Sequence, residues 1–419
     1  MSHHSTENPR LRILQVSAQF PFPPRSGFET RVYQLARALA SRHDVTLLSY
    51  VDSGRRDDVE RLRDHLSVAV VEREPVSRSA KRMSQLVSAA SRRPFAFRSV
   101  YSPEMQQAID ELCSTRTFDV ILVESSVLGA FSFPRGPRLV LDEHNIEYEV
   151  FARMHKSERS LPRRLFNRLE YTRFRRLERA WWRQVDGCAV TSEREAAIVR
   201  SHAPKTPLAV VPNGVDLDYF SPREAKPDPQ SVVFNGVLDY RPNLDAAHFL
   251  ADEIWPLVLE RVPDARLSIV GRGEPADLRR LDRPGIVPTG EVPDLRPYLA
   301  SAALVVVPIR MGGGTRLKVV EGLAMAKAMV TTSIGCEGVD VRDGEHLLVA
   351  NAPDAFAAAV VGLLQDRTLA HALGAAGRAR MEERYSWELA GGRMEKLFRC
   401  VPSESYAAVQ VKLAPAALR

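Results

Sequence analysis

Short runs rich in valine, leucine and isoleucine alternate with longer amphipathic segments along this chain, and this alternation restricts its fold more than any single motif. A first series of runs lies at residues 11–17, 45–51, 118–124, 138–142 and 187–191. A second series lies at residues 231–236, 266–271, 286–290, 304–308, 328–332 and 346–350. Such runs are typical of parallel strands buried on both faces. We predict an α/β protein with two doubly wound, Rossmann-like domains and a ligand cleft at the carboxyl ends of both sheets.

The division into domains follows from length and local composition. A chain of 419 residues is long enough for two hydrophobic cores. The segment 221–230 is rich in proline and charge and is expected to be a linker or boundary loop. We predict domains at residues 10–205 and 206–385, a last amphipathic helix at 386–402, and a loose tail at 403–419.

Composition narrows the classes of protein further. Hydrophobic residues make up 45% and charged residues 26% of the chain, as in soluble globular proteins. The four cysteines are far apart and form no CxxC pair, which argues against a disulfide framework or a zinc site. The first ten residues contain no apolar signal core, and no run approaches the about 18 apolar residues of a membrane span. These observations predict a cytoplasmic protein.

The glycine turn at residues 312–314 carries the strongest functional signal. It follows a predicted strand and opens a helix that bears Arg316, Lys318 and Glu321. Free amide groups and the positive end of the helix dipole would face one point there, which suits an anion such as a diphosphate. The carboxylate one turn later can accept hydrogen bonds from sugar hydroxyls. We predict an anion site with a solvent-facing Lys318; the alternative is a glycine turn beside a solvated basic face.

The positive charge is concentrated in one predicted helix. Residues 159–183 contain nine arginines, opposite an apolar stripe that includes Phe174, Leu177 and Trp181. Such a helix can bind an anionic membrane surface, but we favour a helix that packs on its own domain with a solvated arginine face. We therefore expect weak membrane contact at most, at the inner face of a membrane. Nucleic acid is not an expected partner, because no binding motif accompanies the charge.

Three motifs are more specific than the alternation itself: the turn Asn213-Gly-Val-Asp, the block that begins at Gly312, and Asp142-Glu-His-Asn-Ile-Glu-Tyr-Glu. With them, residues 10–400 resemble the GT-B glycosyltransferases, in particular the retaining group called glycosyltransferase family four. The pattern that begins Gly236-Val-Leu-Asp-Tyr resembles bacterial members that assemble surface polysaccharides or exopolysaccharides. The resemblance implies a nucleotide-sugar bound mainly by the C-terminal domain, an acceptor bound by the N-terminal domain, and a last helix that crosses back to the first domain.

The resemblance also assigns residues. Arg316 and Lys318 would hold the donor diphosphate and stabilise the charge that develops on it. Glu321 matches the glutamate that binds the ribose, and His144 lies where the family keeps a histidine near the reacting sugar. The predicted catalytic residues are therefore His144, Arg316 and Lys318. The predicted donor-binding residues are Gly27, Gly236, Arg241, Gly271, Gly290, Gly313, Gly314, Thr315 and Glu321. The glycines at strand ends would leave room for the nucleotide.

Two positions depart from the family pattern. Members often carry a first glutamate eight positions before the ribose glutamate, and Gly313 stands there in this chain. Val237 occupies the position of a common arginine, and Arg241-Pro-Asn replaces the motif that usually follows. The resemblance then implies that Arg316 and Lys318 carry most of the cationic work, helped by Arg241.

The implied reaction needs no cofactor and no metal. The donor would be a UDP- or GDP-linked sugar, and the acceptor a saccharide or a polyprenyl-linked saccharide. No carboxylate nucleophile is evident, which agrees with a retaining displacement in which the acceptor attacks from the leaving-group side. Two other classes stay open: a GT-B nucleotide-sugar epimerase, and a GT-B scaffold that binds a nucleotide without turnover.

Two weaker signals point elsewhere. The sequence Gly271-Arg-Gly-Glu-Pro-Ala matches a dinucleotide-binding pattern, but Pro275 and a helix of only about two turns argue against it. Asp216 and Asp218 resemble the metal-binding pair of the other glycosyltransferase fold, but they belong to a turn in which aspartates are common. We therefore predict neither a bound dinucleotide nor a metal site.

Overall fold

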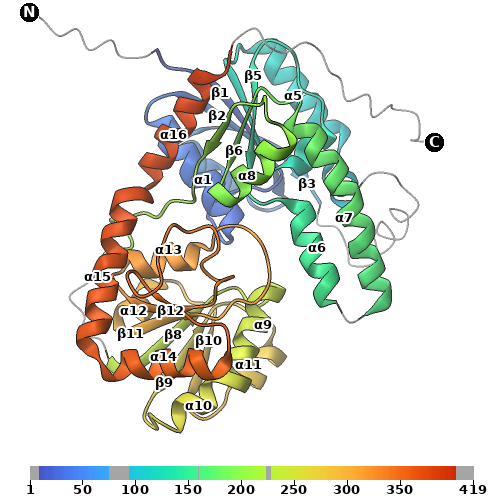
Figure 1. The fold of residues 1–419 in the computed structure, drawn as a ribbon. Coiled ribbons are helices and arrows are strands. Elements are labelled where there is room, and N and C mark those ends of the chain that lie inside the picture. The colour runs from blue at the N-terminus through green and yellow to red at the C-terminus, as the bar shows by residue number, and fades with distance from the viewer. Residues whose placement is uncertain (1–8, 75–93, 159, 223–227, 403–419) are drawn as a thin grey trace, which may run out of the picture. The chain divides into compact units, whose positions relative to one another are not determined.

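The computed structural model describes residues 9–74, 94–158, 160–222 and 228–402 (Figure 1). By its own contacts the chain divides into two compact units. The first contains the residues up to Val211 together with the segment from Ala390 onward, and the second is Pro212–Leu389. The predictions made for residues 159 and 403–419 lie outside the described residues.

The first unit is built on a seven-stranded parallel sheet in the order β3-β2-β1-β4-β5-β6-β7. Its strands are β1 (Arg12–Ser17), β2 (Asp44–Asp52), β3 (Ser67–Arg73), β4 (Val120–Glu124), β5 (Arg138–Glu143), β6 (Gly187–Val190) and β7 (Leu208–Val210). Its helices are α1 (Gly27–Ala40), α2 (Arg56–Arg63), α4 (Phe95–Val100), α5 (Pro103–Thr115), the 3-10 helix η1 (Ser126–Ala130), α6 (Glu147–Ser157), α7 (Leu161–Trp182) and α8 (Glu193–His202). The chain starts in the middle of the sheet and winds outward in both directions, as predicted.

The central strands form because their side chains are buried on both faces. In β1, Ile13, Leu14 and Val16 are completely buried, and β1 pairs in parallel with β2 on one side and β4 on the other. The sequence analysis missed β3 and β7 at the two edges of this sheet. The side chains of both are mostly half-buried, so neither shows the continuous apolar run of a central strand.

The second unit repeats the architecture with a six-stranded parallel sheet in the order β10-β9-β8-β11-β12-β13. Its strands are β8 (Asp228–Asn235), β9 (Arg266–Val270), β10 (Ile286–Gly290), β11 (Ala302–Val307), β12 (Ala328–Thr331) and β13 (Leu348–Val349). Its helices are α9 (Arg241–Phe249), the π-helix η2 (Leu250–Ile254), α10 (Trp255–Leu259), α11 (Pro275–Leu281), α12 (Arg296–Ser301), α13 (Leu317–Ala324), α14 (Pro353–Gln365), α15 (Arg367–Arg384) and the start of α16 (Trp387–Cys400).

Two expectations about this unit were wrong. The segment 221–230 is not a linker throughout, because β8 already begins at Asp228, and the division between the units lies earlier, at Val211 and Pro212. The helix after the glycine turn does not open at Gly314. Instead α13 begins at Leu317, because the intervening backbone is still extended at its N-cap residue.

Helix α16 belongs to both units by its contacts. At its start, the ring of Trp387 lies so close to Gly214 that a Cβ on this glycine would be 2.7 Å from it. From Ala390 onward the residues pack with the first unit. A Cβ on Gly391 would lie 2.9 Å from the Cβ of Ala38 on α1, so the two helices touch closely there.

The basic helix α7 packs on its own unit, which was the favoured interpretation of its sequence. Phe174 and Trp181 are buried, whereas Arg175 and Arg176 are exposed. The glutamates of α7 are buried, so its solvent face carries arginines without neighbouring acids of its own. Within the described residues, none of the helices combines the length and the apolar character that a membrane span requires.

Candidate functional site

The loop between β11 and α13 is the glycine turn identified in the sequence. Gly312 and Gly314 have φ angles of +106° and +71°, which other residues rarely adopt. Arg316 occupies the N-cap of α13 without capping it, and its guanidinium donates to the carbonyl of Gly314 (2.8 Å). Thr315 is buried, and its carbonyl accepts a hydrogen bond from Asn213 (3.4 Å), so the predicted 213–216 turn holds this loop. The glycine loop thus leads into α13, and no side chain caps the start of this helix.

Lys318 is half-buried, which corrects the prediction of a solvent-facing lysine. Its Nζ donates to Oδ1 of Asn243 (2.8 Å) and lies 4.7 Å from the centre of the Phe234 ring. Burial, followed by the charge of Arg316, lowers the pKa of Lys318 to about 7. The ammonium thus rests against an amide oxygen and an aromatic face, both weaker partners than an anion.

Glu321 lies three positions after Lys318 and is also half-buried. Residues at this spacing are neighbours on a helix. Burial raises the pKa of Glu321 to about 7, although the charge of Lys318 acts in the opposite direction. Among the described residues, no donor reaches the carboxylate of Glu321, and it forms no ion pair with Lys318. Two oppositely charged groups are therefore partly desolvated side by side without direct contact.

The predicted glycines of this unit end neighbouring strands, but they are needed chiefly by the protein itself. A Cβ on Gly236 would lie 2.7 Å from Nζ of Lys318, so this glycine makes room for the lysine. A Cβ on Gly271 would lie 2.1 Å from the carbonyl of Gly236. Gly290 has a φ of +73° and accepts a hydrogen bond from the amide of Gly271 (3.0 Å). Glycine is therefore required at 236 and 271 by contacts within the protein, whether or not a nucleotide also needs the space.

Asn243 is the site residue that the sequence analysis did not assign. Its side chain joins Lys318 to the carbonyl of Val237, to which its Nδ2 donates (2.8 Å). The signal was present, because Asn243 stands in the Arg-Pro-Asn sequence that replaces the family's usual motif. Arg241, the first residue of α9, is exposed. Gly313 lies in the same turn as Gly314 and supplies no carboxylate.

In the first unit, the predicted Gly27 is the first residue of α1. Ser26 caps this helix by accepting from the amide of Glu29 (3.3 Å), and Glu29 accepts from the amide of Arg25 (2.6 Å). This reciprocal capping satisfies the amide of Glu29 in the first turn of α1 and the amide of Arg25 before it. The adjoining Phe28 lies against His144, with ring centres 4.6 Å apart.

His144 follows β5 directly and lies in a buried network of charges. Its Nε2 is 2.6 Å from Oε2 of Glu124 and 3.4 Å from Oδ2 of Asp142. Asp142 in turn accepts two hydrogen bonds from the guanidinium of Arg31, at 2.8 and 2.6 Å. Burial lowers the pKa of His144, but the charges and hydrogen bonds of Asp142 and Glu124 outweigh burial and raise this pKa to about 9. The sequence located His144 but not its partners, which come from α1 and β4.

The sequence analysis also missed that three potential metal ligands meet here. One side-chain ligand atom each of Glu124, Asp142 and His144 lies within 4.8 Å of the others. However, both oxygens of Asp142 already accept hydrogen bonds from Arg31, which supplies a positive charge inside the group. A metal ion would have to displace that guanidinium, so the donor set fits an internal ion-pair network better than a metal site.

A second acidic group lies beside His144. Glu178 on α7 accepts hydrogen bonds from the amides of Glu147 (2.7 Å) and Tyr148 (2.9 Å) and so caps α6 from outside. Glu143 accepts from the indole of Trp182 (3.0 Å). Burial raises the pKa of Glu143 to about 8 and that of Glu147 to about 7. This group fixes the start of α6 and hence the loop that contains His144.

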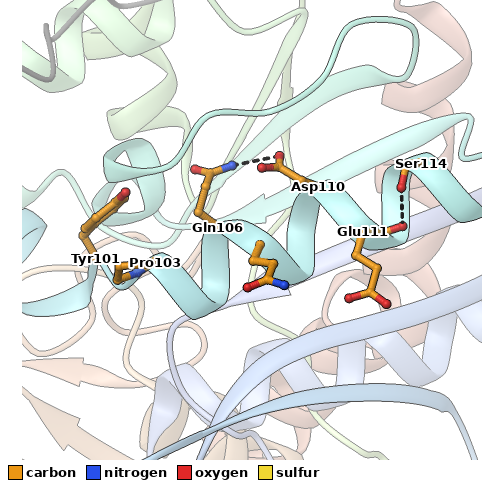
Figure 2. A pocket seen from close by; sticks show the side chains of 7 residues that line it. Tyr101, Pro103, Gln106, Asp110, Glu111 and Ser114 are labelled. Carbon is orange, nitrogen blue, oxygen red and sulfur yellow. Dashed lines mark hydrogen bonds between the residues drawn. The ribbon is translucent and has the colours of Figure 1, made fainter.

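A surface depression of about 700 Å³ lies along α5, away from all these residues (Figure 2). It is lined by Tyr101, Pro103, Gln106, Gln107, Asp110, Glu111 and Ser114. Its polar groups partly satisfy one another, since Gln106 donates to Asp110 (3.1 Å). It contains none of the predicted site residues and is the solvated face of an amphipathic helix.

The predicted residues thus form two groups, one in each unit. In the second unit, Arg316, Lys318 and Glu321 gather with Gly236 around the start of α13. In the first, His144 lies against the loop that contains Gly27.

Known proteins resemble the chain along most of its length. A family model described as Glycosyltransferase Family 4 matches residues 25–219, and one described as Glycosyl transferases group 1 matches residues 229–366. A phosphatidyl-myo-inositol mannosyltransferase of Mycobacterium tuberculosis is 31% identical over 222 residues, 48% of this chain and 56% of the relative. A GDP-mannose-dependent monoacylated alpha-(1-6)-phosphatidylinositol monomannoside mannosyltransferase of Corynebacterium glutamicum is 28% identical over 215 residues, 46% of this chain and 56% of the relative. The chain therefore spans about half the length of these curated relatives.

Among solved structures, a sucrose-phosphate synthase of Thermosynechococcus elongatus has the same fold, with a TM-score of 0.71 at 20% identity over 93% of this chain and 98% of that one. The two family models match consecutive parts of the chain: the first covers strands β2 to β7 of the first sheet, and the second covers nearly all of the second sheet. The chain belongs to the GT-B glycosyltransferases of family four, group 1.

Proposed function

We propose that this protein is a retaining glycosyltransferase that moves a sugar from a nucleoside-diphosphate donor to a saccharide or lipid-linked saccharide. The observation that carries the proposal is the pair Lys318 and Glu321. Both are half-buried and have strongly shifted pKa values, and neither is neutralised by a charged partner among the described residues. Desolvated charges of this kind are costly to the free protein and are recovered when a ligand supplies the missing partners.

The chemistry requires charge stabilisation more than a nucleophile. A diphosphate is already a good leaving group, and the charge that develops on it is stabilised by fixed cations in a partly dry site. Lys318 and Arg316 supply these cations beside the uncapped start of α13. Glu321 accepts hydrogen bonds from the ribose hydroxyls. Gly313 leaves the sugar without the carboxylate contact that related enzymes have, so sugar specificity depends on other groups.

We infer GDP-mannose as the donor, because both relatives described above are named as mannosyltransferases and one is named as GDP-mannose-dependent. These names also favour a lipid-linked acceptor, since both contain phosphatidylinositol. The resemblance to bacterial assembly enzymes supports a role in surface polysaccharide biosynthesis. A lipid-linked acceptor would be presented at a membrane surface, and we propose the inner face of the cytoplasmic membrane.

Helix α7 offers a surface suited to a weak contact with that membrane. Leu161 and Leu165 are 74% and 60% exposed at its first turns, with the exposed Arg164 and Arg168 beside them. Exposed leucines next to arginines fit the boundary between acyl chains and anionic headgroups. We propose peripheral, salt-sensitive binding through this end of α7.

The proposed reaction proceeds without a metal ion. The potential metal ligands Glu124, Asp142 and His144 already contain a positive charge in their midst, because Arg31 pairs with Asp142. Activity is therefore expected to survive excess EDTA. Loss of activity with EDTA, and its recovery with Mn²⁺ or Mg²⁺, would contradict this part of the proposal.

A direct assay tests the proposal as a whole. Purified protein is incubated with GDP-mannose or UDP-glucose, with and without a mixed polyprenyl-linked or phosphatidylinositol acceptor, and products are followed by mass spectrometry. A product heavier than the acceptor by one hexose, with the anomeric configuration of the donor by NMR, is the expected result. Conversion of the donor into an isomer would favour an epimerase. Nucleotide binding without any turnover of donor would favour a non-catalytic scaffold.

A further inference from the structure

His144 has one ring nitrogen in a buried acidic environment and the other without a partner. Nε2 lies between the carboxylates of Glu124 (2.6 Å) and Asp142 (3.4 Å). The side chain is only 7% exposed. For Nδ1, no hydrogen-bond partner exists among the residues that the structure describes. Within the described residues, the ring is therefore hydrogen-bonded through Nε2 and not through Nδ1.

The charges around the ring are balanced only if the ring is protonated. Arg31 binds Asp142 through two hydrogen bonds, so these two charges cancel. Glu124 receives a hydrogen bond from the neutral side-chain amide of Gln15 (2.6 Å). No arginine or lysine of the described residues forms an ion pair with it, although the charge of Arg31 acts on it through space. A buried carboxylate without a counter-charge is unfavourable, and among the described residues the imidazolium of His144 is the cation in contact with it.

We propose that Glu124 and Asp142 hold His144 as an imidazolium, so that the histidine that the resemblance places near the reacting sugar offers a charged Nδ1–H donor to an oxygen of the sugar or acceptor. In this state His144 cannot act as a general base. It is a fixed hydrogen-bond donor and positive charge beside the reacting group. This inference rests on the proposed function, because it takes His144 to face a ligand.

The remaining charged groups near the ring agree with this state. Burial and the charge of Asp142 raise the pKa of Glu124, whereas the hydrogen bond from His144 and the charges of His144 and Arg31 lower it. On α6, the partly buried Glu147 faces the same ring, and the charge of His144 lowers its pKa. On α8, Glu195 lies nearer to Arg31, whose pKa it helps to raise. Among the described residues, Arg31 is the only arginine or lysine that pairs with Glu124 or Asp142.

Glu124 and Arg31 are then positioning residues that touch no ligand. Gln15 ties Glu124 to the carbonyl of Val32 on α1 (3.2 Å), and Arg31 ties Asp142 to the same helix. Helix α1 starts at the loop that contains Gly27 and Phe28. The network therefore fixes the ring of His144 relative to the glycine loop on which the resemblance places a donor contact.

The charge state can be measured without any assay of activity. Protein with ¹⁵N- and ¹³C-labelled histidine is titrated from about pH 6 to about pH 9, and the His144 signals are assigned by comparison with His144→Gln. We expect imidazolium shifts at neutral pH and deprotonation only near pH 9. In Glu124→Gln the ring should lose its proton at least tenfold more easily. A neutral His144 ring in the wild type at pH 7.5 would overturn the proposal, and this result needs no variant to fold.

A matched variant separates positioning from stability. Glu170→Gln also removes a buried carboxylate of the first unit, one that accepts from the amide of Phe95 (2.8 Å) and pairs with Arg173 (3.0 Å) instead of with His144. It should leave the His144 titration unchanged. With activity in hand, Glu124→Gln should lower kcat and make it fall with pH within the neutral range, whereas Glu170→Gln should keep the wild-type pH profile. An unaltered pH profile of kcat in Glu124→Gln would contradict the positioning role.

The contact between Nδ1–H of His144 and a ligand oxygen can be tested by NMR, separately from the charge state. Addition of GDP-mannose, with or without acceptor, should shift the Nδ1 signal of His144 if an oxygen accepts from Nδ1–H. Calorimetric binding without such a shift in either mixture would refute the contact while leaving the proposed donor intact. Failure of GDP-mannose and UDP-glucose to bind at all would instead refute the proposed function, and the titration would still decide the charge state.

Discussion

The two units treat buried charge in opposite ways. Around His144 in the first unit, Asp142 is paired with Arg31 and Glu124 with His144, and both ion pairs are almost completely buried. At the start of α13 in the second unit, Lys318 rests on an amide and an aromatic ring, and Glu321 has no hydrogen-bond partner among the described residues. The two ion pairs of the first arrangement are formed within the protein. We propose that a ligand supplies the missing partners of the second.

This difference predicts what substitution will cost. Removing a member of a closed network exposes its partner to an apolar environment and destabilises the fold. Removing an uncompensated charge relieves a desolvation penalty and weakens only ligand binding. Stability and affinity should therefore respond to mutations in opposite patterns in the two units.

The largest effect is expected from Arg31→Met. The substitution leaves Asp142 buried without its guanidinium, which costs about 3–5 kcal/mol in comparable cases. Urea unfolding measures it. The control is Arg10→Met, which removes an ion pair with Asp44 whose side chains are 55% and 65% exposed. That change should cost less than about 1 kcal/mol. Equal losses in both variants would show that the first unit does not depend on its internal network.

The next largest effect is on nucleotide affinity. Lys318→Met and Glu321→Ala each remove a contact with the donor worth about 1.5–3 kcal/mol, so GDP binding should weaken about tenfold or more. Lys318→Met should also slow the chemical step, because its contact with the diphosphate strengthens as charge develops. Without ligand, the melting temperature of Lys318→Met should be unchanged or higher. Calorimetry with GDP and UDP and thermal unfolding give the two quantities.

Lys327 provides the matched control for this experiment. It is a partly buried lysine of the same unit whose pKa burial lowers to about 8, but its Nζ donates to the carbonyls of Ala300 (2.7 Å) and Ala302 (2.9 Å). Lys327→Met should lower the melting temperature and keep GDP affinity. If Lys318→Met keeps full affinity for both nucleotides, the start of α13 is not the phosphate site.

These charged groups also mark the limit of what the sequence could predict. The central strands were predictable because residues such as Ile13 and Leu14 are buried on both faces and leave a continuous apolar run. The neighbourhood of Lys318 and Glu321 was predictable because it is local, with both residues on one helix. The ion pair of Arg31 and Asp142 was not predictable, because the two residues are 111 positions apart. An arginine in an amphipathic helix is also usually exposed to solvent.

Burial itself was the second limit. The sequence analysis expected Lys318 to face solvent, since lysines usually do. Its burial depends on Asn243 and Phe234, which reach it from α9 and β8. The space it occupies depends on Gly236 having no side chain. The hydrophobic pattern of α13 alone cannot show that residues from other segments surround Lys318.

A smaller effect is a proton taken up when the nucleotide binds. The pKa of Lys318 is about 7 in the free protein, so near pH 8 the amine is mostly neutral. A bound diphosphate raises this pKa, so the complex holds more protons and affinity falls as the pH rises above 7. Glu321, with a pKa of about 7, is already mostly ionised near pH 8 and contributes little there. Calorimetry in buffers of different ionisation enthalpy should show uptake of up to one proton, absent in Lys318→Met.

The smallest expected effect concerns the membrane. Neither the network around His144 nor the site at α13 requires a membrane, so any contact through α7 adds only surface energy, about 1 kcal/mol for each arginine near anionic lipid. Vesicles that contain phosphatidylglycerol should bind the protein weakly at low salt and release it as salt screens the charge. Leu161→Ser with Leu165→Ser should weaken binding a few-fold. Val287→Ser, at a residue 56% exposed in the second unit, should leave it unchanged. Binding that is tight and insensitive to salt would mean that the apolar end of α7 inserts more deeply than two exposed leucines allow.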